Sequence, residues 1–223
     1  MITYKNITII GTSHIALESI QEVTTVLQEN KPGIVALELD HARFLSLMEK
    51  KKVSKWVILK ETGIKSFLLN LIGAFIEKKL GDIVGVSPGS EMRKAALLAR
   101  KQKAKIALID QDVRITLKKL TKIPSKEKWR IFGDIVKGLF QRKAEMRIDL
   151  TKVPEQKFIE TILKKIEDRY PNLYATLITE RNHYMAKSLY KLITEYPEEK
   201  IVAIVGAGHA EALLKEIKEY ETT

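Results

Sequence analysis

Four short runs of apolar, β-branched residues constrain the fold of this chain most strongly. They begin at Ile7, Gly33, Ala104 and Lys200 and read ITIIG, GIVALEL, AKIALID and KIVAIVG. Continuous apolar runs of this length are typical of strands that are buried on both faces of a parallel sheet. Each run is followed by a helical pattern, so the chain reads as strand–helix units. We therefore expect an α/β fold with a mainly parallel central sheet.

Helical periodicity fills most of the chain between these strands. The expected helices cover residues 17–29, 40–50, 93–103, 126–147, 154–168, 173–195 and 211–220. Ser87 is placed to cap the third of them, and Pro88 suits its first position. Residues 50–88 and 116–196 are predicted to be helical insertions that form a lobe over the sheet. Because 223 residues suffice for one sizeable core, we expect a single domain over residues 1–223.

The composition excludes several classes of site. The chain has no cysteine, so disulfides, thiolate metal sites and cysteine nucleophiles are excluded. The N-terminus lacks the pattern of a secretory signal, which favours a cytoplasmic protein. The apolar segment from Ser66 to Phe75 is shorter than the roughly 20 residues that a membrane-spanning helix needs. We interpret it as a core or interface helix.

The net charge of +11 is concentrated in the middle of the chain. From Lys50 to Arg147 there are 25 Lys and Arg against 9 Asp and Glu, whereas the remainder has 14 against 19. Such a segment can attract an anionic membrane surface on the cytoplasmic side, or nucleic acid. No nucleic-acid-binding motif is present, so nucleic acid is not the expected partner. The alternative is a heat-adapted, lysine-rich surface with no anionic partner.

Four polar residues stand where the predicted strands end. His14 and His209 follow the first and last strands in turns of the form Gly-x-x-His, while Glu38 and Asp110 close the second and third. The carboxyl ends of parallel strands are where ligands bind in open sheets. A histidine near a helix N-terminus is favoured in its neutral form, which can bind a metal. Two imidazoles and a carboxylate would suit Zn²⁺, Mn²⁺, Co²⁺ or Fe²⁺, and three glycines allow close backbone approach: Gly11, Gly206 and Gly208.

The same residues have structural explanations that the sequence leaves open. A histidine in a strand-to-helix turn can cap the helix or bind a carbonyl. Glu38 interrupts an apolar strand, where an unpaired carboxylate would be costly, so it is either a ligand or an ion-pair partner of Arg43 or Arg181. Asp110 and Asp112 can cap the next helix.

Further charged and imidazole side chains are less strongly indicated. Glu91 lies in a first helical turn, where the helix dipole alone favours acids. Glu180 and Arg181 are adjacent on a helix, so only one of them need face a site. His41 and His183 lack the glycine turns, and we interpret both as structural or surface residues.

Taken in order, these elements resemble the TraB/PrgY family, in an archaeal form. The resemblance covers nearly the whole chain and consists of GTSH at Gly11, ELDHAR at Glu38, PGSEMRKA at Pro88, LIDQDVRITLKK at Leu108, ER at Glu180 and VGAGH at Val205. The ordered spacing of six motifs is far more specific than any one of them. The family is in turn similar to the TIKI metalloproteases and, more distantly, to the erythromycin-esterase and ChaN-like proteins.

This resemblance implies a divalent-metal-dependent hydrolase of the peptidase type, with peptide or protein substrates. His14, Glu38 and His209 match the proposed ligands of a Mn, Co or Zn ion. Four residues match the other polar positions of the family: Glu91, Arg114, Glu180 and Arg181. Either glutamate is a candidate general base, and either arginine a candidate for binding an oxyanion or a substrate carboxylate. Gln111 stands where the family usually has an arginine.

Two other functions remain alternatives at this stage. The first is a non-catalytic domain that binds a peptide, haem or another signal in the same crevice and regulates a partner, for example by inhibiting signalling. The second is a peripheral membrane module that uses the basic middle segment. Many archaeal relatives continue into C-terminal membrane helices, whereas this sequence ends at Thr223 after a predicted helix. A homodimer is compatible with either alternative.

Overall fold

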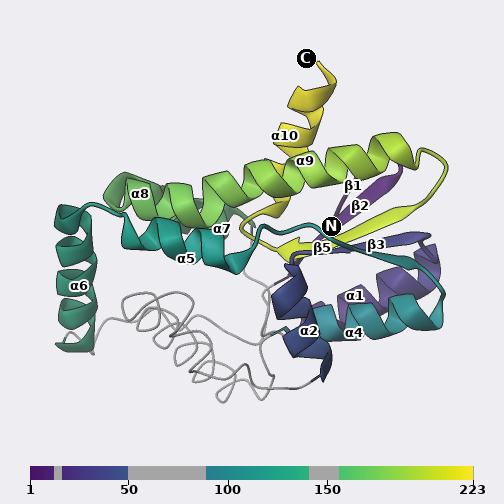
Figure 1. The fold of residues 1–223 in the computed structure, drawn as a ribbon, viewed down its shortest axis with the longest axis horizontal. Helices are drawn as coiled ribbons and strands as arrows, with labels where there is room; N and C mark the ends of the chain where they lie inside the picture. The colour runs from purple at the N-terminus through teal and green to yellow at the C-terminus, as the bar shows by residue number, and fades with distance from the viewer. Residues whose placement is uncertain (13–16, 50–88, 141–155, 223) are drawn as a thin grey trace.

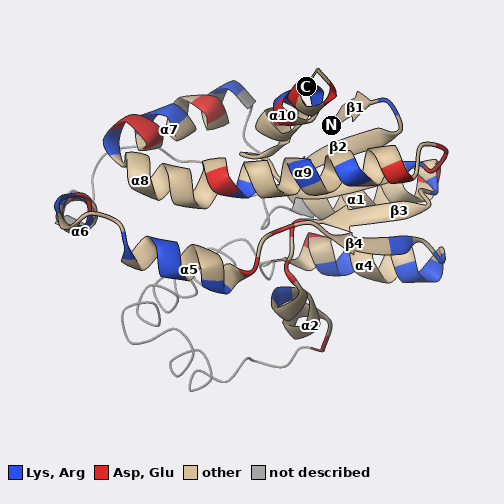
Figure 2. Ribbon diagram, turned by 45° about the horizontal axis from the view of Figure 1, so that its top comes forward, with Lys and Arg blue, Asp and Glu red and all other residues tan. Residues whose placement is uncertain are grey.

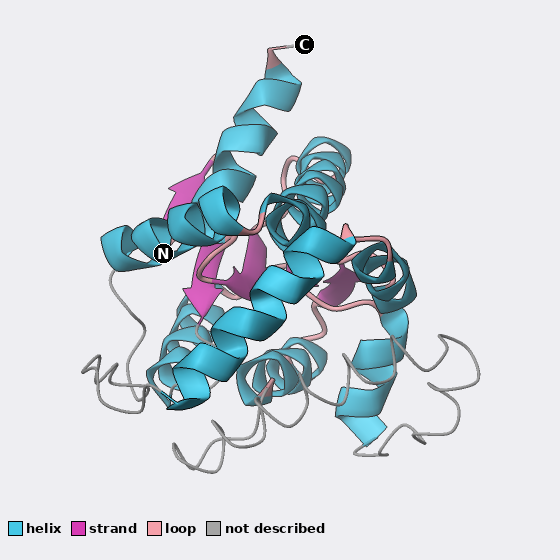
Figure 3. Cartoon of the chain, turned by 90° about the vertical axis from the view of Figure 1, so that its left-hand side faces the viewer, coloured by secondary structure: helices cyan, strands magenta, loops and turns pink. Residues whose placement is uncertain are grey.

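A five-stranded sheet lies between helices in the computed structural model, which describes residues 1–12, 17–49, 89–140 and 156–222 (Figures 1 and 3). The strands are β1 (Ile2–Tyr4), β2 (Ile7–Thr12), β3 (Ile34–Leu37), β4 (Lys105–Leu108) and β5 (Ile201–Gly206). Their order in the sheet is β1-β2-β5-β3-β4. All neighbours pair in parallel except β1, which is antiparallel to β2. The predicted α/β fold with a mainly parallel sheet is therefore confirmed.

The two strands that precede the Gly-x-x-His turns are neighbours in the sheet. β2 and β5 run in parallel, and their last residues, Thr12 and Gly206, are register partners. His209 lies three residues after the end of β5. His14, by contrast, belongs to residues 13–16, which lie outside the described part of the chain. The relative placement of the two imidazoles stays a prediction.

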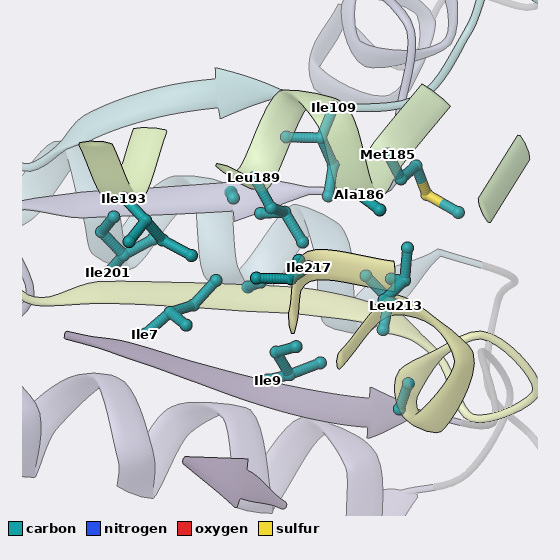
Figure 4. Close-up of a cluster of buried hydrophobic side chains, with 14 of the residues drawn as sticks. Ile7, Ile9, Ile109, Met185, Ala186, Leu189, Ile193, Ile201, Leu213 and Ile217 are labelled. Carbon is teal, nitrogen blue, oxygen red and sulfur yellow. The ribbon is translucent and has the colours of Figure 1, made fainter. Parts of the chain in front are cut away.

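Alternate residues of the strands enter two hydrophobic clusters, one on each face of the sheet. Along β5, Ile201, Ala203 and Val205 join one cluster, whereas Val202 and Ile204 join the other. On the first face the strands pack against α9 (Glu180–Glu195) and α10 (Ala210–Glu221), as Figure 4 shows. On the second face they pack against α1 (Leu17–Asn30) and α4 (Ser90–Lys101). Apolar burial on both faces explains why the strands read as continuous hydrophobic runs.

The remaining described helices lie mainly to one side of the sheet (Figure 1). They are α2 (His41–Glu49), α5 (Val113–Thr121), α6 (Ser125–Phe140), α7 (Gln156–Arg169) and α8 (Pro171–Tyr174), with a π-helical segment, η1 (Ala175–Thr179), between α8 and α9. The insertion predicted for residues 50–88 lies outside the described residues. In the described residues, no helix combines the length and the apolar run needed to cross a bilayer.

The start of α4 differs from the prediction. The helix begins at Ser90, and Gly89 occupies the N-cap position with a φ of 77°. Ser87 and Pro88, which the sequence suggested as cap and first residue, lie outside the described residues. A glycine is the residue that takes this left-handed conformation at least cost, and Ser90 and Glu91 of the PGSE motif already belong to the helix.

Candidate functional site

Glu38 lies directly after β3 and is almost fully buried. Its Oε2 atom accepts a 2.5 Å hydrogen bond from the backbone N–H of Gly206 at the end of β5. Its Oε1 atom accepts a hydrogen bond from Nη2 of Arg181. The carboxylate is thus held at both oxygens between a neighbouring strand and helix α9. The ion pair with Arg181 that the sequence left open as an alternative is formed.

Arg181, on the first turn of α9, is the centre of the cluster. Its side chain is only 15% exposed, and each of the five N–H donors of the guanidinium has an acceptor. Nε and Nη2 donate to the two carboxylate oxygens of Asp110, at 3.1 and 2.8 Å. Nη2 also donates to Glu38. Nη1 donates to the Leu177 carbonyl at 3.2 Å and to Nε2 of His209 at 3.3 Å. Burial alone would lower the pKa of Arg181, but the charge of Glu38 and the hydrogen bonds that Arg181 donates to Asp110 outweigh it and raise the pKa.

Asp110, which follows β4, is shared between two arginines. Besides Arg181 it accepts a 3.0 Å hydrogen bond from Nη1 of Arg43 on α2, and its Oδ1 accepts the backbone N–H of Gln111. The side chain of Asp110 is buried, whereas that of Arg43 is 43% exposed. Arg43 is therefore the cation through which this cluster meets solvent. Asp112 instead forms the N-cap of α5, which confirms its structural interpretation.

His209 is buried at the N-cap position of α10, but its side chain makes no capping hydrogen bond. Its Nδ1 atom lies 2.5 Å from Oδ1 of Asn182. Because an amide oxygen only accepts, this contact assigns the proton to Nδ1. In the neutral imidazole Nε2 then carries no proton, and it faces Nη1 of Arg181 at 3.3 Å and Oε1 of Glu38 at 3.4 Å. A hydrogen bond that fixes the tautomer in this way is typical of histidines that bind a metal.

Two of the three predicted metal ligands therefore converge. Tetrahedral zinc with bonds of about 2.0–2.1 Å places neighbouring ligand atoms roughly 3.4 Å apart, which is the separation of His209 Nε2 and Glu38 Oε1. In the described structure, however, the guanidinium of Arg181 contacts both atoms. No group of three His, Asp or Glu that could hold a metal occurs among the described residues. The third predicted ligand, His14, lies outside them.

The other predicted site residues do not all join this cluster. Glu91 is buried in the first turn of α4. Arg114 points outward, 62% exposed, and pairs with its own helix cap, Asp112. Glu180 is partly exposed and forms a 2.8 Å ion pair with Lys119 of α5. Of the adjacent residues Glu180 and Arg181, only the arginine enters the cluster.

The glycines near the site serve close packing. A Cβ atom at Gly11 would lie 3.1 Å from the Cα atom of Ala207, whereas one at Gly208 would meet Leu163 of α7 at an ordinary 3.5 Å. Among the described glycines, Gly89 is the one with a positive φ. Gly206 takes part through its backbone N–H, which binds Glu38.

Sequence reasoning missed Asn182 and did not include Arg43 among the site residues. Asn182 is adjacent to Arg181, yet both reach the cluster because the ring of His209 lies between them, with Nδ1 toward the amide and Nε2 toward the guanidinium. The π-helical segment η1 immediately precedes these residues. Single π-turns inside α-helices are frequent at functional sites, but their position cannot be read from helical periodicity.

The fold and the cluster together define a class: a mainly parallel α/β protein whose strand ends carry a buried carboxylate–arginine–histidine network. The sequence matches the TraB/PrgY/gumN family over residues 3–217, and the chain belongs to this family.

Its relatives include one archaeal and several mammalian proteins. The uncharacterized protein MJ1365 of Methanocaldococcus jannaschii is 39% identical over 97% of this chain and 54% of its own length. The TraB domain-containing proteins of Bos taurus and Homo sapiens are 23% and 21% identical, over 93% of this chain and 61% of their own length. This chain thus spans a little more than half the length of these curated relatives.

Proposed function

We propose that the cluster of Glu38, Asp110, Arg181 and His209 is the reaction centre of a divalent-metal-dependent hydrolase of the peptidase type. Glu38 and His209 would hold the cation, Mn, Co or Zn, and His14 is the third ligand that the family resemblance implies. The observation that carries the proposal is the 3.4 Å approach of Nε2 and Oε1. Both atoms are presented by side chains whose other ends are fixed by Asn182 and Gly206.

The chain's own residues prepare this centre. When bound, the cation would supply positive charge that polarises a carbonyl and makes water more acidic. Asn182 keeps the imidazole of His209 in the tautomer that leaves Nε2 available for coordination. The Gly206 N–H orients the carboxylate of Glu38. For the cation to enter, Arg181 would give up its contacts with Glu38 and His209 while keeping Asp110.

Acid–base and substrate-binding roles divide among the remaining charged residues. Glu91 is our candidate for the general base that accepts a proton from the attacking water, because it matches a polar position of the family and is buried in the first turn of α4. Glu180, which is partly exposed beside Lys119, is the alternative. All five donors of Arg181 are occupied, so it acts first as a positioning residue. Arg43, which is exposed and already turned toward Asp110, suits the binding of a substrate carboxylate.

Metal content of purified, dialysed variants tests this proposal. His209→Ala and Glu38→Gln should lose most of the bound metal, because an open site with three protein ligands has little redundancy. Asn182→Ala should weaken metal affinity by roughly 10–100-fold without abolishing binding, as removal of an outer-shell partner does.

His183→Ala is the matched control, since this histidine of α9 is exposed and contacts Tyr220 and Glu216. It should retain the wild-type stoichiometry. Equal metal content in wild type, His209→Ala and Glu38→Gln would refute the metal site, provided that the variants keep the wild-type circular dichroism spectrum.

Arg181 favours a second candidate, the non-catalytic regulatory domain. A guanidinium that satisfies two buried carboxylates and a histidine makes a stable polar cluster without a cation. In that case the crevice would bind a peptide or another signal without turnover. Retained peptide binding, with no hydrolysis of a diverse peptide library in the presence of Mn²⁺, Co²⁺ or Zn²⁺, would support this candidate over the hydrolase.

A further inference from the structure

Helix α6 carries two large aromatic side chains on an open surface. Trp129 is 72% exposed and Phe132 is 58% exposed. Their ring centroids lie 5.9 Å apart in an edge-to-face arrangement. Residues three apart share one face of a helix, so these rings form a single apolar patch. A Cβ atom at Gly133 would have no neighbour within 4 Å, so this side of the helix is open.

Both acidic residues of α6 are used within the protein. Glu127 is buried, and its carboxylate accepts hydrogen bonds from the side-chain amide of Asn172 and the backbone N–H of Leu173, at the start of α8. Asp134 forms a two-pronged ion pair with Arg169, at 2.6 and 2.7 Å, and accepts a hydrogen bond from Tyr170. The negative charges of α6 therefore lie on the side that meets α7 and α8.

The basic residues of α6 border the aromatic patch instead. Lys126, Arg130 and Lys137 are exposed, and Arg130 also donates a hydrogen bond to the Arg169 carbonyl of α7. Arg130 and Lys137 lie four and eleven residues after Lys126, which is close to one and three full helical turns. All three residues therefore lie along one line of the helix, beside the aromatic face. Lys128 lies at the other edge of the patch and donates to the Thr121 carbonyl. The open face of α6 thus presents an aromatic centre with a cationic border and no described carboxylate.

The basic excess in the middle of the sequence is not one continuous face among the described residues. Figure 2 shows the Lys and Arg residues of α4 on the opposite side of the molecule from those of α5 and α6. α6 itself stands at the outer edge, far from the sheet (Figure 1). An anionic partner that this segment attracts would therefore meet α6 locally, where the cations accompany exposed aromatic rings.

We propose that α6 is an interfacial helix that docks the protein on a membrane of anionic phospholipids. Helices of this kind place Trp and Phe at the boundary between head groups and acyl chains, while Lys and Arg on their borders reach the phosphates. Charge complementarity selects anionic lipids. A convex helix with two rings packed edge to face offers no groove along which a nucleic-acid strand could run with its bases stacked.

Vesicle co-sedimentation of the full chain tests this docking surface. The protein should bind vesicles of phosphatidylcholine with phosphatidylglycerol, lose binding as salt is raised, and ignore vesicles of phosphatidylcholine alone. The double variant Trp129→Ala/Phe132→Ala should reduce the partition coefficient roughly tenfold or more. Lys126→Glu/Lys137→Glu should do the same at low salt, through charge reversal.

Matched controls change exposed residues of the same kinds on other elements. Leu97→Ala/Tyr184→Ala removes exposed apolar surface from α4 and α9, and Lys94→Glu/Lys187→Glu reverses exposed charges on the same two helices. Both should bind vesicles as wild type does.

Three results would overturn the proposal. They are absence of binding to phosphatidylglycerol vesicles, equal losses in the control variants, and binding to a single-stranded oligonucleotide that depends on Trp129 and Phe132 while vesicle binding does not. Because the altered side chains are exposed, unchanged thermal unfolding is expected and confirms that each variant is folded.

Discussion

Two neighbouring residues of α9 illustrate how burial changes the contribution of an ion pair. Glu180 pairs with Lys119 where both side chains are about two-fifths exposed, and such pairs contribute little because water screens them. Arg181 pairs with Glu38 and Asp110, whose side chains are almost completely buried. Removing one partner there leaves a charge in a poorly hydrated environment. We therefore expect the cluster to be sensitive to single polar substitutions.

We predict that Arg181→Met lowers the free energy of unfolding by about 3–5 kcal/mol, because it leaves the Glu38 carboxylate buried beside His209 without its cation. Adding Glu38→Gln should recover at least about 1 kcal/mol, since the uncompensated charge is then removed. Urea titrations of the single and double variants measure both values. Lys119→Met, the exposed counterpart, should cost less than about 1 kcal/mol. Strictly additive effects of Arg181→Met and Glu38→Gln would contradict this account.

At the scale of elements, the sequence predicts the strands, from their apolar runs, and the meeting of polar residues at the strand ends. All four predicted strands are found, and the polar residues that follow β3, β4 and β5 within three positions meet. Three features escaped prediction for physical reasons. β1 has only three residues and is defined by pairing with β2. The position of η1 cannot be read from helical periodicity, and Asn182 acts through a contact with His209 that no local pattern encodes.

Close approach between β2 and the start of α10 gives a prediction at this scale. Gly11→Ala should destabilise the protein by about 1–3 kcal/mol, because its Cβ would press on the backbone of Ala207 at 3.1 Å and on the side chain of Ala210 at 3.4 Å. Gly208→Ala, whose Cβ would meet only Leu163 and Ile159 at ordinary distances, should change stability by less than about 1 kcal/mol. Thermal unfolding of the two variants measures the loss of stability in each. Equal losses would show that the approach of β2 to Ala207 is not what requires glycine.

Apolar packing and polar contacts stabilise different parts of the molecule. The sheet and its flanking helices are held by the two apolar clusters on its faces. Among the described residues of α6, α7 and α8, polar contacts link the helices. Arg130 donates to the Arg169 carbonyl, Asp134 pairs with Arg169, and Glu127 binds the start of α8. Ion pairs and hydrogen bonds to carboxylates weaken when the carboxylates are protonated, whereas apolar packing does not depend on pH in this way. The stability of α6–α8 should therefore depend on pH more strongly than that of the sheet.

Acid should therefore loosen α6–α8 before the sheet. Arg169 and Tyr170 lower the pKa of Asp134 from 3.8 to about 2. Burial tends to raise the pKa of Glu127, but hydrogen bonds from Asn172 and Leu173 lower it overall. Because both folded pKa values lie below those of the unfolded chain, the stabilisation is complete above about pH 4.5 and declines as the pH falls toward 2.

Native-state hydrogen exchange, corrected for the pH dependence of intrinsic exchange, measures this order of events. Opening free energies of α6–α8 should fall between about pH 4.5 and 2 while those of β2, β3 and β5 fall less. Asp134→Asn should flatten the response of α6, since the variant has no carboxylate to protonate at this position. If the strands and α6–α8 lost protection in a single step, or if Asp134→Asn responded to acid as wild type does, the ion pair with Arg169 would not be what holds α6 in place, and apolar contacts across α6–α8 would have to do so.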